Sequence, residues 1–436
     1  MSVITGLSGR EILDSRGRPT VEASCQLAGG AAATASVPSG RSTGTAEAVE
    51  LRDGDPRRYG GLGCLKAAAG INGEIASALS GRELPDQRAL DDALRALDGT
   101  PSKSRLGANS ILAVSVAFAR AQAMQGGVPL HQHFSGMLPP GAAAERMRPP
   151  HLPRLTINLW SGGKHAGGQV SIQDVLVIPL SPDTIDGSLV MMHDIYAAAA
   201  KIALERYGMR ALAADEGGLA PQFESIDAML AAAVESIERA GFVPGTDAAL
   251  AVDVAASHFS QGRSYSHGGS YRIDGRDLSA DGMIRLVDSW LGRYPILSVE
   301  DALAEEDWTG WPRLEQTVGR HALVLGDDFL CTNPGRIQRA IDAKACSALL
   351  LKVNQVGTVS EAVDALTLAR SAGWQVTVSV RSGETEDSWA ADLAAGWQAD
   401  QFKNGSITRS ERLAKYNRLL AIEAATGWKV RPWKRP

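Results

Sequence analysis

Residues 348–380 read ALLLKVNQVGTVSEAVDALTLARSAGWQVTVSV. The segment opens with an apolar, β-rich run at Ala348–Val353 and continues through a helical apolar pattern at Val359–Ser371. It ends with a second β-rich run at Gln375–Val380. A strand, a helix and a second strand in this order predict two parallel strands joined by a crossover helix.

The same alternation extends outward from this segment over roughly 280 residues, a length typical of a closed (β/α) barrel. We expect further strands and helices, and we therefore predict an α/β fold whose main domain, residues 139–436, is such a barrel. The further strands are Val175–Leu180, Ala249–Asp253, Ile296–Glu300 and Ala322–Gly326, and the further helices are Ser225–Ala240, Ala280–Leu291 and Pro334–Ala343.

The N-terminal part of the chain, residues 1–138, has a different pattern, typical of a mixed α+β domain. Glu11–Glu22 predicts a strand, a Gly-Pro turn and a second strand. Ala46–Asp53 is expected to begin a helix, and Ser110–Gln122 predicts a nearly all-apolar helix that packs on both sides. A linker is expected at residues 136–153, where Pro, Gly and Ala dominate.

Composition excludes several classes of protein. The 436 residues carry 44 basic and 49 acidic side chains, a net charge of −5, which argues against a general nucleic-acid binder. No apolar run approaches the ~18 residues that span a bilayer, and we expect no secretory signal. Four widely spaced cysteines are typical of buried thiols in a reducing compartment. We expect a cytoplasmic enzyme without a nucleic-acid or membrane partner, whose basic C-terminal tail frays and has no assigned role.

Charged side chains follow the predicted strands where each strand ends. Asp253, Glu300 and Asp327 follow three successive apolar runs, and Lys352 and Arg381 follow the next two. In a barrel these strand ends form the face that carries the chemistry. Three converging carboxylates would repel one another unless a cation lay between them, and oxygen ligands favour Mg²⁺. A single aspartate in such a place is usually a cap or a surface charge, but three in succession favour a metal site.

Lys352 lies in the apolar stretch Leu349–Gly357, and only ten of the 44 basic residues are lysines. Burial and a nearby metal would both disfavour its ammonium form and lower its pKa toward that of a general base. The alternative is a lysine that extends to solvent. Glu216, on the glycine-containing turn Ala214–Pro221, adds an acid, although such a carboxylate alone is usually a helix cap. Together these groups predict removal of a proton α to a carboxylate, with Mg²⁺ stabilising the enolate.

The chain resembles the enolase (phosphopyruvate hydratase) family from end to end. Ordered motifs carry the resemblance, and so many of them leave little room for chance. The matching stretches are Ile12–Gly17, Val37–Gly40 with Ser42–Gly44, Gly107–Leu112, Gly163–Gly167, Asp215–Gly218, Asp253–Ser257, Gly326–Asp328, Leu351–Gln355, Arg381–Asp387 and Arg409–Asn417.

The resemblance implies a modified (β/α)8 TIM-type barrel with an α+β N-terminal capping domain, two Mg²⁺ ions per active site and a homodimer. It also implies a role for each matching residue. Asp253, Glu300 and Asp327 would bind the first Mg²⁺, and Ser42, on a loop, would bind a second that arrives with substrate. Lys352 would be the general base, Glu216 the acid that helps hydroxide leave, and Lys403 a second lysine at the substrate carboxylate. Arg381 and Ser382 would bind phosphate, and His165 would lie on a loop that closes over substrate.

Five positions beside the substrate depart from the family's pattern. Val380 stands where enolases carry histidine, Asp174 stands where they carry glutamate, and Arg41 stands where they usually carry alanine. Gly168 replaces an asparagine, and residues 404–407 replace Thr-Gly-Ala-Pro. Val380 removes a donor on the phosphate side, the Asp174 carboxylate is withdrawn by roughly 1–1.5 Å, and Arg41 adds a cationic fork. With the metal ligands and both lysines kept, these changes indicate an altered substrate.

We therefore expect an enolase-type lyase acting on a small anionic phosphorylated or phosphonylated three-carbon acid. One offshoot of the family, the carboxyphosphonoenolpyruvate synthases of phosphonate and antibiotic biosynthesis, joins a cytidylyl-activated phosphonoformate to a three-carbon enolpyruvyl unit, and the departures favour that reaction. The alternatives are ordinary dehydration of 2-phosphoglycerate to phosphoenolpyruvate and, less favoured, a silent binding protein or a dehydratase of non-phosphorylated acid sugars.

Overall fold

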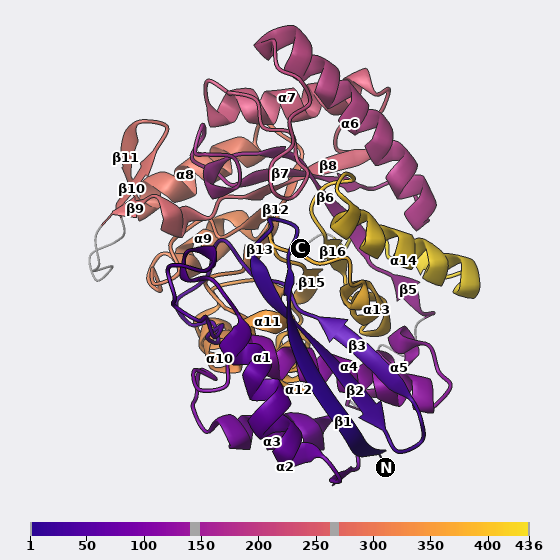
Figure 1. Ribbon diagram of the computed structural model, residues 1–436. Coiled ribbons are helices and arrows are strands. Elements are labelled where there is room, and N and C mark those ends of the chain that lie inside the picture. The colour runs from indigo at the N-terminus through magenta and orange to yellow at the C-terminus, as the bar shows by residue number, and fades with distance from the viewer. Residues whose placement is uncertain (1, 140–148, 262–269, 435–436) are drawn as a thin grey trace.

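The computed structural model describes residues 2–139, 149–261 and 270–434, which form a small N-terminal domain beside a closed barrel (Figure 1). Helices α6 and α7 of the barrel lie at the top of this view, and the N-terminal sheet crosses its lower part. The predicted modified (β/α)8 barrel with an α+β N-terminal domain is confirmed. The boundary between residues 138 and 139 stays a prediction, since residues 140–148 lie outside the described part.

An antiparallel sheet in the order β3-β2-β1-β4 forms one face of the N-terminal domain. Asp14 closes the turn between the first two strands, because its Oδ1 accepts hydrogen bonds from the backbone N–H groups of Arg16 (2.8 Å) and Arg18 (3.0 Å). This confirms the strand–turn–strand expectation for Glu11–Glu22. The strands are β1 (Ser2–Leu13), β2 (Pro19–Leu27), β3 (Ala32–Ser36) and β4 (Glu83–Leu84).

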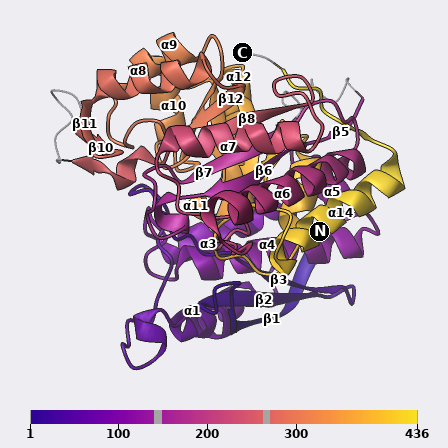
Figure 2. The same ribbon diagram turned by 90° about the horizontal axis from the view of Figure 1, so that it is seen from above.

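Helix α4 (Ala108–Gln125) joins the sheet to the barrel. It packs against β2 and β3 and also contacts α3 (Gln87–Asp98) and α11 (Val353–Val356). Figure 2 shows α3 and α4 between the sheet and the barrel. Most side chains of α4 are buried, which confirms the helix predicted from Ser110–Gln122. The other helical elements here are η1 (Tyr59–Gly61), α1 (Leu65–Gly70), η2 (Ile71–Ile75), α2 (Ala76–Leu79) and α5 (Leu130–Gly136).

The helix expected to begin within residues 46–53 is absent from this described segment, so that prediction was wrong. The backbone groups bond to distant partners instead: the N–H of Ala48 donates to the carbonyl of Gln355 and the N–H of Val49 to that of Ser102, both at 2.8 Å. Because each backbone N–H needs a partner, tertiary bonds replace the helical ones. The extended segment fixes the preceding loop against the barrel.

Eight strands close the barrel in the order β12-β13-β14-β15-β16-β6-β7-β8. All neighbours are parallel except that β7 runs antiparallel to both β6 and β8. Residues 162–173 join β6 to β7 with only one short 3₁₀ turn, and without a crossover helix the chain returns antiparallel. The strands are β6 (Arg154–Ser161), β7 (Asp174–Pro179), β8 (Ala248–Asp253), β12 (Ile296–Glu300), β13 (Leu323–Gly326), β14 (Ala348–Leu351), β15 (Gln375–Ser379) and β16 (Gln401–Lys403).

The helices of the barrel begin at caps that the sequence already carries. Helices α8, α10 and α12 have the predicted bounds, and Ser279, Asn333 and Thr358 cap their first turns by accepting backbone N–H groups. The helices are α6 (Ile185–Tyr207), α7 (Ile226–Arg239), α8 (Ala280–Leu291), α9 (Trp311–Val318), α10 (Pro334–Ala343), α12 (Val359–Ser371), α13 (Trp389–Gly396) and α14 (Ser410–Thr426).

Small elements complete the described chain. A parallel pair joins the start of the barrel to the C-terminal tail, and a three-stranded antiparallel sheet lies beside α8 (Figure 1). They are β5 (His151–Leu152), β17 (Lys429–Val430), β9 (Ser260–Gln261), β10 (Ser270–Ile273), β11 (Arg276–Ser279), η4 (Gly163–His165) and η5 (Ala256–His258).

The basic C-terminal tail does not fray within the described residues, contrary to expectation. Trp433 packs against apolar side chains of the barrel, among them Leu325 and Leu350. The backbone carbonyl of Lys434 accepts a hydrogen bond from Gln375 Nε2 at 2.9 Å. Because Gln375 begins β15, the tail covers the N-terminal ends of the strands, opposite the end where the predicted site lies.

Candidate active site

Five charged side chains come together where the barrel strands end. Asp253, Glu300 and Lys403 are the last residues of β8, β12 and β16, and Asp327 and Lys352 directly follow β13 and β14. All five are at most 7% exposed. Closure of the barrel therefore brings together residues that lie up to 150 positions apart in the chain.

The two lysines form ion pairs with the three carboxylates. Lys403 Nζ lies 2.8 Å from Asp253 Oδ2 and 2.7 Å from Glu300 Oε2, and Lys352 Nζ forms an ion pair with Asp327 Oδ2. Burial disfavours the charged form of Lys403, but the two carboxylates outweigh it and raise its pKa well above the ordinary value. Burial and the nearby Asp253 also raise the pKa of Glu300.

The expectation of a lowered pKa at Lys352 is not met. Burial does disfavour the ammonium form, but the carboxylate of Asp327 outweighs burial and raises the pKa. The prediction from the sequence included a metal ion beside Lys352 but not the direct ion pair between Lys352 and Asp327. A cation that drew Asp327 away would remove the main cause of the shift.

The predicted metal ligands fit a hard divalent cation. Glu300 Oε1 is buried and has no hydrogen-bond partner among the described residues, although Oε2 is bonded to Lys403. Carboxylate oxygens of Asp301, Asp327 and Asp328 also lie within 4.8 Å of one another. Oxygen-only donors of this kind suit Mg²⁺. The assignment of Asp253, Glu300 and Asp327 as its ligands stays a prediction.

The reversed direction of β7 brings a further acid to the same end of the barrel. Asp174 is the first residue of β7 and pairs across the sheet with Asp253, the last residue of β8. Its carboxylate is fully buried: Oδ1 accepts hydrogen bonds from Asn158 Nδ2 (2.6 Å) and Ser161 Oγ (2.8 Å). Oδ2 lies 2.8 Å from His165 Nδ1.

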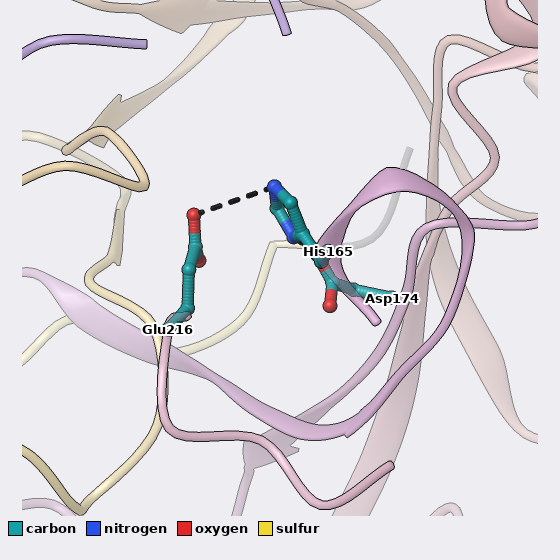
Figure 3. Close-up of side chains that lie close together, drawn as sticks. All are labelled: His165, Asp174 and Glu216. Carbon is teal, nitrogen blue, oxygen red and sulfur yellow. Dashed lines mark hydrogen bonds and ion pairs between the residues drawn. The ribbon is translucent and has the colours of Figure 1, made fainter. Parts of the chain in front are cut away.

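His165 lies between two carboxylates. Figure 3 shows Asp174 on one side of the ring and Glu216 on the other, with His165 Nε2 3.8 Å from Glu216 Oε1. Burial would lower the pKa of His165, but Asp174 and Glu216 outweigh it and raise the pKa to about 9. Burial likewise favours neutral Glu216, whereas His165 and nearby cations lower its pKa. At neutral pH the ring is therefore an imidazolium that can donate from both nitrogens.

Arg381, predicted to bind phosphate, is buried and already holds an acid. Its Nη1 and Nη2 lie 3.0 and 3.1 Å from the two carboxylate oxygens of Glu47. Nη2 also donates to the backbone carbonyl of Ser42 at 2.7 Å. A Cβ at Gly40 would lie 2.0 Å from Nη2, so only glycine lets the loop approach Arg381 this closely.

The remaining predicted substrate residues have different surroundings. Ser382 Oγ accepts a hydrogen bond from Arg16 Nη1 at 3.1 Å, and Val380 is buried directly after β15. Arg41 Nη1 forms an ion pair with Asp215 Oδ2 at 2.9 Å. Gly168 is exposed, with φ of +83°, on the loop between β6 and β7.

Sequence reasoning missed several residues that hold these groups. Glu47 gave no signal because its segment was expected to be helical, and Asn158 and Ser161 lie on β6, a strand that was not predicted. Gln173, whose Nε2 donates to Asp253 Oδ2 at 3.0 Å, and Arg16 lie inside or beside quoted motifs. The available signal was different for each: Gln173 directly precedes Asp174, and Arg16 lies inside the matching stretch Ile12–Gly17.

The fold and this set of buried acids and lysines define a barrel enzyme with its site at the C-terminal ends of the strands. A family model described as the enolase N-terminal domain matches residues 4–134, and one described as the enolase C-terminal TIM barrel domain matches residues 150–431. The chain belongs to the enolase family. Across the described ranges, no helix has both the length and the hydrophobicity to cross a bilayer.

Proposed function

We propose that the chain is a Mg²⁺-dependent enzyme that removes the α-proton of a small phosphorylated or phosphonylated three-carbon acid. The placement of Lys352 and Lys403 beside three buried carboxylates at one end of the barrel carries this proposal. Both lysines are buried, so each is held in one place and little water surrounds it. The retained set argues against a silent binding protein, because three buried carboxylates that converge on one place repel one another and would destabilise a site without function.

Each proposed site residue has a separate role in the reaction. Lys352, once its amine is neutral, accepts the α-proton, and Lys403 faces the substrate carboxylate. Asp253, Glu300 and Asp327 would hold Mg²⁺, with Ser42 at a second ion. Bound Mg²⁺ supplies positive charge that stabilises the enolate. Glu216 gives a proton to the leaving hydroxide, so that the overall change releases water.

The phosphate or phosphonate group would bind at Arg381 and Ser382. Arg381 already holds the carboxylate of Glu47 in a two-point contact, the geometry that a phosphoryl group also accepts. Binding of the substrate would thus replace one anion by another, and the loop that carries Ser42 would adjust with it.

The particular reaction that we favour is carboxyphosphonoenolpyruvate synthesis, with a cytidylyl-activated phosphonoformate as second substrate. Val380 offers no donor where the family has histidine, and Arg41 adds a cation at the site margin. The test is to incubate the protein with Mg²⁺, 2-phosphoglycerate and the activated phosphonoformate, and to follow phosphorus by NMR. A product in which the phosphonoformyl phosphorus is joined to the enolpyruvyl unit supports the proposal. Rapid formation of phosphoenolpyruvate as the sole product contradicts it.

Ordinary phosphopyruvate hydratase is the second candidate. It is favoured by the complete set of lysines and carboxylates, which dehydration of 2-phosphoglycerate also needs. The same NMR experiment separates the two. A homodimer and a cytoplasmic location stay predictions.

A further inference from the structure

We propose that Asp174 is a positioning residue that acts through His165, and that His165 and Glu216 together hold the proton which the leaving group takes. The inference deepens the proposed function and rests on it, because it assigns the proton source for the same elimination. It concerns three side chains that lie in a row, as Figure 3 shows.

The carboxylate of Asp174 has no oxygen left for a substrate. Oδ1 is held by Asn158 Nδ2 and Ser161 Oγ, and Oδ2 by His165 Nδ1, at 2.6, 2.8 and 2.8 Å. The side chain is 0% exposed. Asp174 is therefore placed to orient the imidazole and is not placed to touch the reacting atoms.

The support behind Asp174 is itself tightly fitted. Asn158 Nδ2 also donates to Ser161 Oγ at 3.1 Å, so the two donors are linked to each other. Gly218, on the loop that carries Glu216, packs against them, since a Cβ there would lie 2.6 Å from Ser161 Oγ. The loop that carries Glu216 thus packs against the two β6 side chains that hold the carboxylate of Asp174.

Asp174 keeps Nδ1 of His165 protonated, so that the proton the ring releases is the one on Nε2. A carboxylate facing Nδ1 keeps a proton on Nδ1, and the ring then directs Nε2 toward Glu216. The raised pKa of His165 agrees with this geometry, because Asp174 and Glu216 both favour the imidazolium. Asp253 also raises the pKa of His165, and the charge of His165 in turn lowers the pKa of the neighbouring His258.

The proton then moves in a balanced sequence. Lys352 takes the α-proton, the carbon–oxygen bond to the leaving hydroxyl breaks, and the hydroxide takes a proton from Glu216 to become water. In the resting site this proton lies on the His165 imidazolium, because the pKa of Glu216 is lowered. His165 Nε2–H therefore supplies it to Glu216 as the carbon–oxygen bond breaks, and solvent restores the imidazolium. Lys352 returns the α-proton to solvent, so no oxidant or co-reactant is needed.

Asp174→Asn tests the assignment sharply. Two donors fix the position of Oδ1, so the amide must place its oxygen there and turn its NH₂ toward His165 Nδ1. Nδ1 then has to accept, which leaves a neutral ring with its proton on Nε2. The variant keeps the shape of the side chain and removes the imidazolium.

Four proteins are compared in D₂O with Mg²⁺ and 2-phosphoglycerate: wild type, Asp174→Asn, His165→Asn and the double variant. We expect each single variant to lose at least about 100-fold in product formation, the range of general acid catalysis, while exchange of the α-proton for deuterium continues. The double variant should lose no more than either single one, because both changes act on one group. Multiplied losses, wild-type turnover in Asp174→Asn, or loss of exchange as well would overturn the inference.

Two controls keep the outcome interpretable. Lys352→Ala should lose both exchange and product. Asp91→Asn removes an equally buried carboxylate of the N-terminal domain and should keep wild-type kinetics. If wild type neither exchanges nor forms product, the proposed substrate is wrong, but the positioning role is still measured by ¹⁵N NMR of labelled histidine. A proton on His165 Nδ1 in wild type that is absent in Asp174→Asn supports it, and identical spectra reject it.

Discussion

Arg41 Nη1 lies 2.9 Å from Asp215 Oδ2, and this ion pair joins two loops at the margin of the site. Arg41 precedes Ser42, and Asp215 precedes Glu216, so the pair links the proposed second metal ligand to the proposed acid. Both side chains are about one-third exposed. Pairs exposed to this degree contribute at most about 1 kcal/mol to stability, so an anionic ligand can displace Asp215 at little cost.

We predict that Arg41 binds substrate more than it stabilises the fold. Arg41→Ala should raise the KM for the anionic substrate about tenfold or more, since a charged hydrogen bond contributes about 1.5–3 kcal/mol. The free energy of unfolding should change by less than about 1 kcal/mol. The matched variant Asp215→Asn breaks the same pair but leaves the cation free, and its KM should stay equal or fall. A parallel rise of KM in both variants would show that the pair itself is what matters.

Mg²⁺ should stabilise a protein that is already folded without it. The two lysines neutralise part of the charge of the three carboxylates, so removal of metal with a chelator should leave the circular dichroism unchanged. Added Mg²⁺ should raise the melting temperature with the concentration dependence of ligand binding. Glu300→Gln should abolish that rise, while Glu315→Gln, which removes a carboxylate between α9 and the barrel, should keep it. A metal response unaffected by Glu300→Gln would exclude Glu300 as a ligand.

Much of the barrel and its charged ring could be predicted, because strand-ending residues show directly in a linear pattern. Asp253, Glu300 and Lys352 each close an apolar run, and Thr358 marks the start of α12. The sequence could not show which side chains form ion pairs or hydrogen bonds with one another. The bond from Lys403 to two distant carboxylates depends on barrel closure, and neither this bond nor the antiparallel direction of β7 appears in any local periodicity.

The same limit explains why Asp174 was read only as a shortened acid. Its role follows from its hydrogen bonds with Asn158 and Ser161, which lie on β6. This strand was not predicted, because it directly follows the Pro-rich linker in the sequence. The prediction of a helix beginning within residues 46–53 was wrong for a related reason. The local composition of this segment suits a helix, but tertiary hydrogen bonds to Gln355 hold the backbone extended.

Val380 should be a determinant of which reaction the site performs. Val380→His returns a polar donor to the phosphate side, and we expect dehydration of 2-phosphoglycerate to increase ten- to a hundredfold, the equivalent of about 1.5–3 kcal/mol. Synthesis from the activated phosphonoformate should fall in the same variant, because the added ring reduces space. Val380→Leu adds volume without a donor and serves as the control. Equal effects of the two variants would assign the change to size alone.

Asp91 should make stability fall as pH rises through the weakly acidic range. This carboxylate is fully buried beneath α12, and its oxygens accept hydrogen bonds from Ser115 Oγ (2.6 Å) and the N–H of Ser360 (2.8 Å). Burial outweighs these bonds and raises the pKa from 3.8 to about 6. Between these values the folded chain keeps a proton that the unfolded chain has released, so the contribution is complete below pH 4 and is lost by about pH 6.

Two pKa units at about 1.4 kcal/mol each predict a loss of about 3 kcal/mol over that window. The measurement is the free energy of unfolding in urea at several pH values, for wild type and Asp91→Asn. The variant cannot titrate here, so the difference between the two proteins should change by that amount and then level off. Other titrating groups cancel in the difference, since both proteins carry them. A difference that stays constant from pH 3.5 to 7 would show that the pKa of Asp91 is the same in the folded and unfolded chains, and that the hydrogen bonds from Ser115 and Ser360 offset the effect of burial.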